Sequence, residues 1–142
     1  MFTKESIIEN VHKLSEQSEF PVSTFIVSSN AALRLNTAGP ECEVLNIEVL
    51  PHNFIKLCCL YPQARNVYQG AIRQRNRTEF VDELKLYVQE GLMSVTSLLI
   101  PNVEIVVTNG IHHRTTASVV DVKRHLGSPK DYMDIVSLGF RP

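Results

Sequence analysis

The residues whose types are best suited to catalysis or metal binding lie in the segment TNGIHHRTTA, residues 108 to 117. An Asn-Gly pair precedes His112, His113 and Arg114 there, and imidazole groups can act as general bases or as metal ligands. His112 and His113 would bind one ion poorly, because adjacent strand residues point to opposite faces whereas a metal needs converging imidazoles. The sequence contains no HExxH or CxxC motif. We therefore expect no metal site.

A catalytic histidine needs a nucleophile or an orienting carboxylate close to it. The spacing of the sequence pairs no such group with His112 or His113. The candidates are several serines, Cys58, Asp121, Asp131 and Asp134. The chain also has no GxSxG motif, no phosphate-binding glycine loop and no dinucleotide fingerprint. We therefore expect no catalytic residues, no cofactor and no enzymatic activity.

A basic segment, RNVYQGAIRQRNR, spans residues 65 to 77. If it is a strand, Arg73, Arg75 and Arg77 project to one face and could contact phosphates or stack on bases. The alternative is a solvated sheet edge, where positive charge discourages aggregation, or a contact for an acidic protein. The net charge of −1 provides no global attraction to nucleic acid. We predict an interaction surface at Arg73, Arg75, Arg77, His112, His113 and Arg114.

Two segments have the apolar periodicity of helices. Residues 3 to 17 carry an apolar stripe at helical spacing, with Thr3 as the N-cap. Residues 77 to 99 have a longer stripe with Thr78 as an N-cap candidate. Its members are Phe80, Leu84, Tyr87, Val88, Leu92 and Val95. These patterns predict an N-terminal helix and one long central helix.

Several runs of β-branched and aromatic residues predict strands. They lie within residues 21–29, 42–50, 54–61, 66–74 and 131–140. Residues 30–41 indicate a loop with an Ala-Gly-Pro turn, or continued pairing with a break there. Residues 102–127 contain two further runs around Asn109 and Gly110, the strongest short signal for a hairpin.

A two-residue turn at Asn109 and Gly110 determines which residues of this hairpin face each other. The resulting pairs are Val107 with His112, Val106 with His113, and Ile105 with Arg114. This register puts apolar and polar side chains on the same face, and a longer or bulged loop would relieve that by shifting the pairing one residue. Both registers are compatible with the sequence.

The order of helix, strands, long helix and strands predicts one α+β domain over residues 1–142, with an N-terminal helix and one long central helix on a largely antiparallel sheet. No apolar stretch approaches the roughly 18 residues of a membrane span. The N-terminus lacks the basic flank and apolar core of a signal peptide. We expect a cytoplasmic or virion protein without a membrane partner, and with Cys42, Cys58 and Cys59 reduced and buried.

The element order resembles that of small phage tail-terminator or tail-completion proteins, with ESIIENVHKL as the first helix and AIRQRNRTEFVDELKLYVQEGL running from strand into helix. The resemblance implies a domain that forms a ring at the end of a tail tube, and it transfers no functional residue. Several predicted strands alternate only incompletely between apolar and polar residues, and this pattern independently favours sheets that are joined across subunits. We predict a non-enzymatic structural subunit of a homo-oligomeric assembly, partnered with itself and other assembly proteins. The alternative is a small nucleic-acid-binding protein that uses the Arg73 to Arg77 segment.

Overall fold

The computed structural model describes residues 1–36, 42–72, 77–98 and 104–142, without the side chains of residues 70–72 and 77–79. These residues form five α-helices and one seven-stranded sheet, which confirms the α+β class. The helices are α1 (Lys4–Ser18), α2 (Ser29–Asn36), α3 (Pro51–Leu60), α4 (Thr116–Leu126) and α5 (Pro129–Ser137). The strands are β1 (Ile26–Ser28), β2 (Val44–Val49), β3 (Arg65–Ile72), β4 (Arg77–Val88), β5 (Gly91–Ser97), β6 (Ile105–Thr108) and β7 (Ile111–Arg114).

The sheet has the strand order β3-β4-β5-β2-β1-β7-β6. β2 is parallel to β5 and β1 is parallel to β7, whereas the other neighbouring strands are antiparallel. The sheet is therefore mixed, with four antiparallel pairings and two parallel ones, so it is largely antiparallel as predicted but not purely so. Parallel neighbours need long connections, and the chain from β2 to β5 accordingly runs through α3, β3 and β4.

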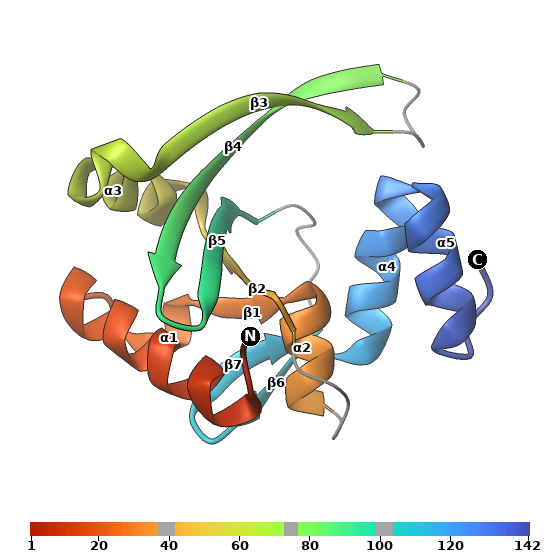
Figure 1. The fold of residues 1–142 in the computed structure, drawn as a ribbon, viewed down its shortest axis with the longest axis horizontal. Helices are drawn as coiled ribbons and strands as arrows, with labels where there is room; N and C mark the ends of the chain where they lie inside the picture. The colour runs from red at the N-terminus through yellow and green to blue at the C-terminus, as the bar shows by residue number, and fades with distance from the viewer. Residues whose placement is uncertain (37–41, 73–76, 99–103) are drawn as a thin grey trace.

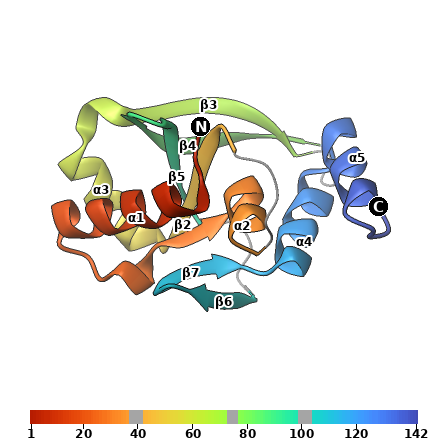
Figure 2. The same ribbon diagram turned by 60° about the horizontal axis from the view of Figure 1, so that its bottom comes forward.

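The elements form a layered core with a long ribbon attached to it. Figure 1 shows β3 and β4 arching away from the central strands, with α4 and α5 packed together on the far side. In both views α1 and α2 lie beside the central strands β1 and β2 (Figure 1, Figure 2). The buried core joins Val11 of α1, Leu45 and Ile47 of β2, and Val95 of β5.

The N-terminal helix is confirmed. Thr3 is its N-cap, and its hydroxyl accepts a hydrogen bond from the Ser6 amide at 3.1 Å. The Ser6 hydroxyl accepts one in return from the Thr3 amide at 2.9 Å. This reciprocal cap satisfies two amide groups that the first turn would otherwise leave unpaired. The buried stripe of the helix includes Ile7, Val11 and Leu14.

The predicted hairpin around Asn109 and Gly110 is also confirmed, as β6 and β7. The observed pairs are Ile105 with Arg114, Val106 with His113, and Val107 with His112, the register of the two-residue turn. Asn109 and Gly110 have φ values of 50° and 79°, as such a turn requires. No bulge is needed, because β6 is the edge strand and its apolar side chains are exposed on both faces.

The predicted long helix over residues 77–99 is wrong, because β4 and β5 form a hairpin there. The strands pair from Glu83 opposite Thr96 to Val88 opposite Gly91. Apolar residues spaced four apart fit a strand as well as a helix, since four is also a multiple of the strand period. Leu84 is buried whereas Tyr87 is exposed. Pairing with β3 and β2 decides between the two periods.

Three predicted strands are helices: residues 54–61 lie mostly in α3, residues 117–126 in α4, and residues 131–137 in α5. End signals explain two of them, because they outweigh the β propensity of valine and isoleucine. In α4 the Thr115 hydroxyl accepts from the Ser118 amide, and Gly127 ends the helix in the left-handed conformation. In α5 Ser128 and Asp131 form a reciprocal cap. The predicted loop at residues 30–36 is also helical, within α2.

Candidate functional site

Polar side chains form a row across the central strands. Ser28 pairs with Asn46, Asn46 pairs with Ser94, and Ser94 pairs with Lys85. Residues directly opposite each other project to the same face of a sheet. The row therefore crosses β1, β2, β5 and β4 on one face, and β2 places Glu48 on the same face, two residues beyond Asn46.

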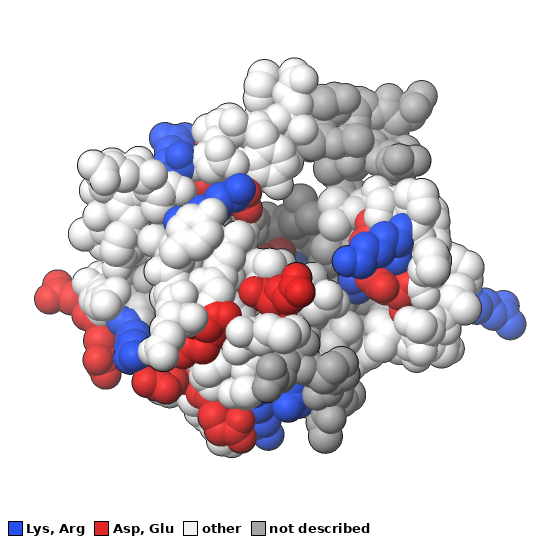
Figure 3. Space-filling view, in the orientation of Figure 1, with Lys and Arg blue, Asp and Glu red and all other residues white. Residues whose placement is uncertain are grey.

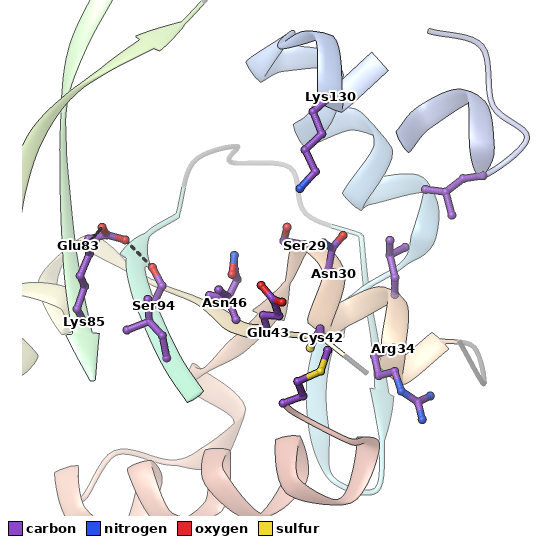
Figure 4. A pocket seen from close by; sticks show the side chains of 15 residues that line it. Ser29, Asn30, Arg34, Cys42, Glu43, Asn46, Glu83, Lys85, Ser94 and Lys130 are labelled. Carbon is purple, nitrogen blue, oxygen red and sulfur yellow. Dashed lines mark hydrogen bonds and ion pairs between the residues drawn. The ribbon is translucent and has the colours of Figure 1, made fainter. Parts of the chain in front are cut away.

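A cavity of about 870 Å³ lies over this face. Figure 3 shows it as a hollow between the central strands and the α4–α5 pair, and Figure 4 shows its labelled side chains. β2, β4 and β5 supply one wall, α2 supplies a second, and α5 and the residue after it supply a third. The lining residues are Met1, Ser29, Asn30, Leu33, Arg34, Cys42, Glu43, Val44, Asn46, Glu83, Lys85, Leu92, Ser94, Lys130 and Leu138.

The start of α2 opens into the cavity. β1 ends at Ser28 and α2 begins at Ser29, whose φ of 54° turns the chain sharply from strand to helix. Ser29 and Asn30 both line the cavity. The first amide groups of a helix have no partner within the helix, and together with the helix dipole they favour an anion. The strand-to-helix turn therefore gives one end of the cavity an affinity for negative charge.

Lys130 lies across the cavity from the start of α2. Its side chain extends from the first turn of α5 toward Ser29 and Asn30 (Figure 4). Within the described part of the chain Lys130 is exposed and makes no ion pair. A flexible ammonium group that faces helix amides can bind an anion from the opposite side.

Two acidic side chains line the cavity: Glu83 has partners within the protein, whereas Glu43 is exposed and makes no ion pair or side-chain hydrogen bond among the described residues. Glu83 is buried and accepts a hydrogen bond from the Ser94 hydroxyl at 2.6 Å. Its other oxygen lies 3.8 Å from the Lys85 ammonium. Burial raises the pKa of the Cys42 thiol, which keeps that sulfur protonated and poorly nucleophilic. The cavity is thus equipped for binding an anion more than for covalent catalysis.

Glu48 and Arg114 form a buried ion pair beside the cavity floor. The guanidinium donates from Nε to one carboxylate oxygen of Glu48 and from Nη2 to the other at 3.1 Å. Its Nη1 donates to the Ser118 hydroxyl at 2.7 Å. Glu48 is 4% exposed and Arg114 is 1% exposed. Such a fork-shaped contact fixes both charged groups in one geometry.

The structure removes two residues from the predicted interaction surface. Arg114 is buried by its contacts with Glu48 and Ser118, and His113 is fully buried on the opposite face of β7. The Nε2 of His113 lies 2.7 Å from the Thr108 hydroxyl and its Nδ1 lies 3.1 Å from the Arg114 carbonyl. Burial lowers the pKa of His113, against the opposing effect of that backbone contact. A neutral, buried histidine is a structural group and cannot contact a partner.

The remaining predicted site residues fall into two groups. His112 is half-buried beside Ile26, on the opposite face from His113. Arg73 and Arg75 lie outside the described residues, and Arg77 is described only as the first backbone position of β4. A surface at Arg73, Arg75 and Arg77 therefore stays a prediction.

Sequence reasoning missed the residues that form the cavity, above all Ser29, Asn46, Ser94 and Lys130. The signal that could have found the first is the apolar run FIV followed by two serines and a helix-compatible segment, a strand-to-helix turn of the kind that binds anions. The other three belong to elements far apart in the chain. Within the described residues no three His, Cys, Asp or Glu side chains converge on a common metal position.

Comparison of the sequence with known protein families and with curated proteins finds no match. Solved structures do resemble the chain. A proposed nucleotidyltransferase from Thermotoga maritima matches with a TM-score of 0.62 and 9% identity, over 96% of this chain and 94% of that one. A proposed nucleotidyltransferase from Helicobacter pylori matches less well, with a TM-score of 0.45 and 12% identity, over 92% of this chain and 67% of that one. The first likeness shows that the two proteins share a fold.

The predicted function, a non-enzymatic structural subunit of a homo-oligomeric assembly with a nucleic-acid-binding protein as its alternative, is therefore wrong. The chain has the fold of a proposed nucleotidyltransferase. None of the comparisons bears on a phage tail terminator, and the predicted partners and lack of catalysis stay predictions. No helix in the described ranges has the length and apolar character needed to cross a membrane.

Proposed function

We propose that the protein binds a nucleotide in the cavity over its central strands. The observation that carries this proposal is the strand-to-helix turn at Ser29 and Asn30, which opens into the cavity opposite Lys130. The fold supports the choice of ligand, because the Thermotoga maritima protein that shares it is described as a nucleotidyltransferase candidate. A nucleotide is the ligand class that such a protein handles.

The phosphate groups of the nucleotide would lie between α2 and α5. Amides at the start of α2 and the ammonium of Lys130 are positive groups on opposite sides of that space. Backbone amides at a helix N-terminus are a common phosphate site in proteins. Lys130 would add a mobile positive charge that can follow the phosphates.

The base and sugar would occupy the less charged part of the cavity. Leu33, Val44, Leu92 and Leu138 contribute apolar surface, and Asn46 contributes an amide that can both donate and accept hydrogen bonds. The volume of about 870 Å³ lies within the range of roughly 300 to 1,000 Å³ typical of small-molecule sites. A nucleoside triphosphate therefore fits the cavity in both size and polarity.

Titration calorimetry with ATP tests the proposal. Charge-assisted hydrogen bonds contribute roughly 1.5 to 3 kcal/mol, and screening at the exposed Lys130 reduces this value. We therefore expect Lys130→Ala to raise the Kd for ATP about five- to tenfold. Lys56→Ala is the matched control, because Lys56 is also exposed but lies on α3, outside the cavity lining. A wild-type protein that binds no ATP, or equal losses in both variants, would refute the proposed site.

A further inference from the structure

Nucleotidyl transfer requires particular groups around the nucleotide, and the side chains of this cavity can be compared with that requirement. The reaction joins an acceptor oxygen to the α-phosphorus of a nucleoside triphosphate and expels pyrophosphate. Enzymes that displace groups at phosphorus commonly use divalent cations to stabilise the attacking and leaving oxygens. Mg²⁺ at such sites is bound by one or two carboxylates together with the substrate phosphates. A transferase of this kind therefore needs free carboxylates facing the nucleotide.

The centre of the cavity floor provides neutral side chains instead. Asn46 and Ser94 pair directly across β2 and β5, and both line the cavity. An amide and a hydroxyl carry no charge and are weak ligands for a hard cation without carboxylate neighbours. The two central positions of the floor therefore do not fit a divalent ion.

Glu48 is the nearest carboxylate along β2, but its oxygens are already engaged. Arg114 donates to both of them, and Ser118 holds the guanidinium from the other side. An arginine side chain does not lose its proton in proteins. A divalent cation at Glu48 would have to displace this pair from a buried position and then remain beside the positive guanidinium.

The other two carboxylates near the cavity do not complete an ion site with Glu48. Glu48 and Glu83 both pair with Thr96 of the strand between them, so their backbones are about 10 Å apart, two strand spacings. Glu43 precedes β2 by one residue, and five residues of extended chain separate it from Glu48 by about 16 Å. Glu83 is engaged by Ser94 and Lys85, so Glu43 is the one free carboxylate in the described cavity lining, without a second free carboxylate beside it.

We infer that the Arg114 guanidinium takes the place of a divalent cation at Glu48, so that the cavity holds an intact nucleoside triphosphate without metal and the protein is a nucleotide-binding domain that does not transfer nucleotides. This inference rests on the proposed nucleotide site. The charge of the phosphates is balanced by Lys130 and by the amides of α2. Without a bound metal the described residues offer no divalent charge to stabilise a leaving pyrophosphate.

ATP binding in excess Mg²⁺ and in excess EDTA provides the first test. Because Mg²⁺ neutralises part of the charge that Lys130 would bind, we expect the Kd for ATP to be equal or lower in EDTA. Incubation with α-labelled ATP and Mg²⁺ should label neither the protein nor added nucleotide and RNA acceptors. Binding at least tenfold tighter in Mg²⁺, or label transferred to an acceptor, overturns the inference but keeps the nucleotide site. No ATP binding in either buffer overturns the nucleotide site itself.

Mn²⁺ binding, followed by electron paramagnetic resonance, tests the role of Arg114 directly. We expect the wild-type protein with ATP to retain no more Mn²⁺ than ATP alone. The Asn46→Asp/Arg114→Met variant places two carboxylates two residues apart on one face of β2, without the Arg114 charge, and we expect it to acquire a protein-bound Mn²⁺ signal. The Glu48→Gln/Arg114→Met variant conserves neutrality and should bind ATP in EDTA within about threefold of wild type. A wild-type Mn²⁺ signal that this neutral variant loses would show that Glu48 binds metal and would overturn the inference.

Discussion

Replacement of Arg114 by methionine tests the buried ion pair most directly. The side chain of Arg114 is 1% exposed and that of Glu48 is 6% exposed, so the variant removes the positive charge that compensates a buried carboxylate. Breaking a buried pair by removing one partner typically costs about 3 to 5 kcal/mol, because the remaining charge loses its compensation. The Ser118 hydroxyl also loses its guanidinium donor. We expect the free energy of unfolding to fall by about 3 to 5 kcal/mol.

Urea denaturation followed by circular dichroism measures this loss. Two further variants separate the effect of the buried charge from the effects of packing and of exposure. Replacing both partners with neutral groups of similar size can be close to neutral, so Glu48→Gln/Arg114→Met should recover more than half of the loss. The matched control is Arg65→Met, which breaks a second two-point contact, with Asp82, whose side chains are 52% and 34% exposed. A pair this exposed should cost no more than about 1 kcal/mol.

The reasoning about charge compensation fails if Arg114→Met loses less than about 1 kcal/mol, the value typical of surface pairs. It also fails if the double variant is as unstable as the single one, since the loss would then come from packing of the methylene groups and not from the uncompensated charge of Glu48. Equal losses in Arg114→Met and Arg65→Met would show that burial does not strengthen the contact.

Two further predictions concern stability. Gly91 has a φ of 153°, and a Cβ there would lie 2.8 Å from the Glu43 carbonyl oxygen, so Gly91→Ala should lower the melting temperature. Burial lowers the pKa of His113 below its ordinary value of 6.5, so the unfolded chain binds the proton more readily and stability should fall as pH drops below about 6.5. His113→Gln should flatten this dependence in urea titrations, whereas replacing the exposed His12 should not; an unchanged slope would exclude His113 as its source.

Short-range signals explain which elements could be predicted from sequence. The reciprocal cap of Thr3 and Ser6 spans three residues, and the Asn109-Gly110 turn determines its hairpin register by backbone conformation alone. In the same way the Thr115 cap and Gly127 mark α4, although the valines between them favoured a strand prediction. These features depend on groups adjacent in the chain, so no knowledge of the fold is needed to interpret them.

The tertiary structure decided whether residues 77–99 form a helix or strands, and it decided which residues make up the site. Leu84 and Leu92 are compatible with a helix or a strand, and β2 and β3 determine the outcome by offering unpaired edges for hydrogen bonding. Glu48 and Arg114 are 66 positions apart, and neither has a sequence neighbour that identifies the other. Residue types alone therefore determined which charges the protein carries. Only packing brought one arginine close enough to neutralise one glutamate, because electrostatic compensation depends on distance and burial, and the order of residues along the chain specifies neither.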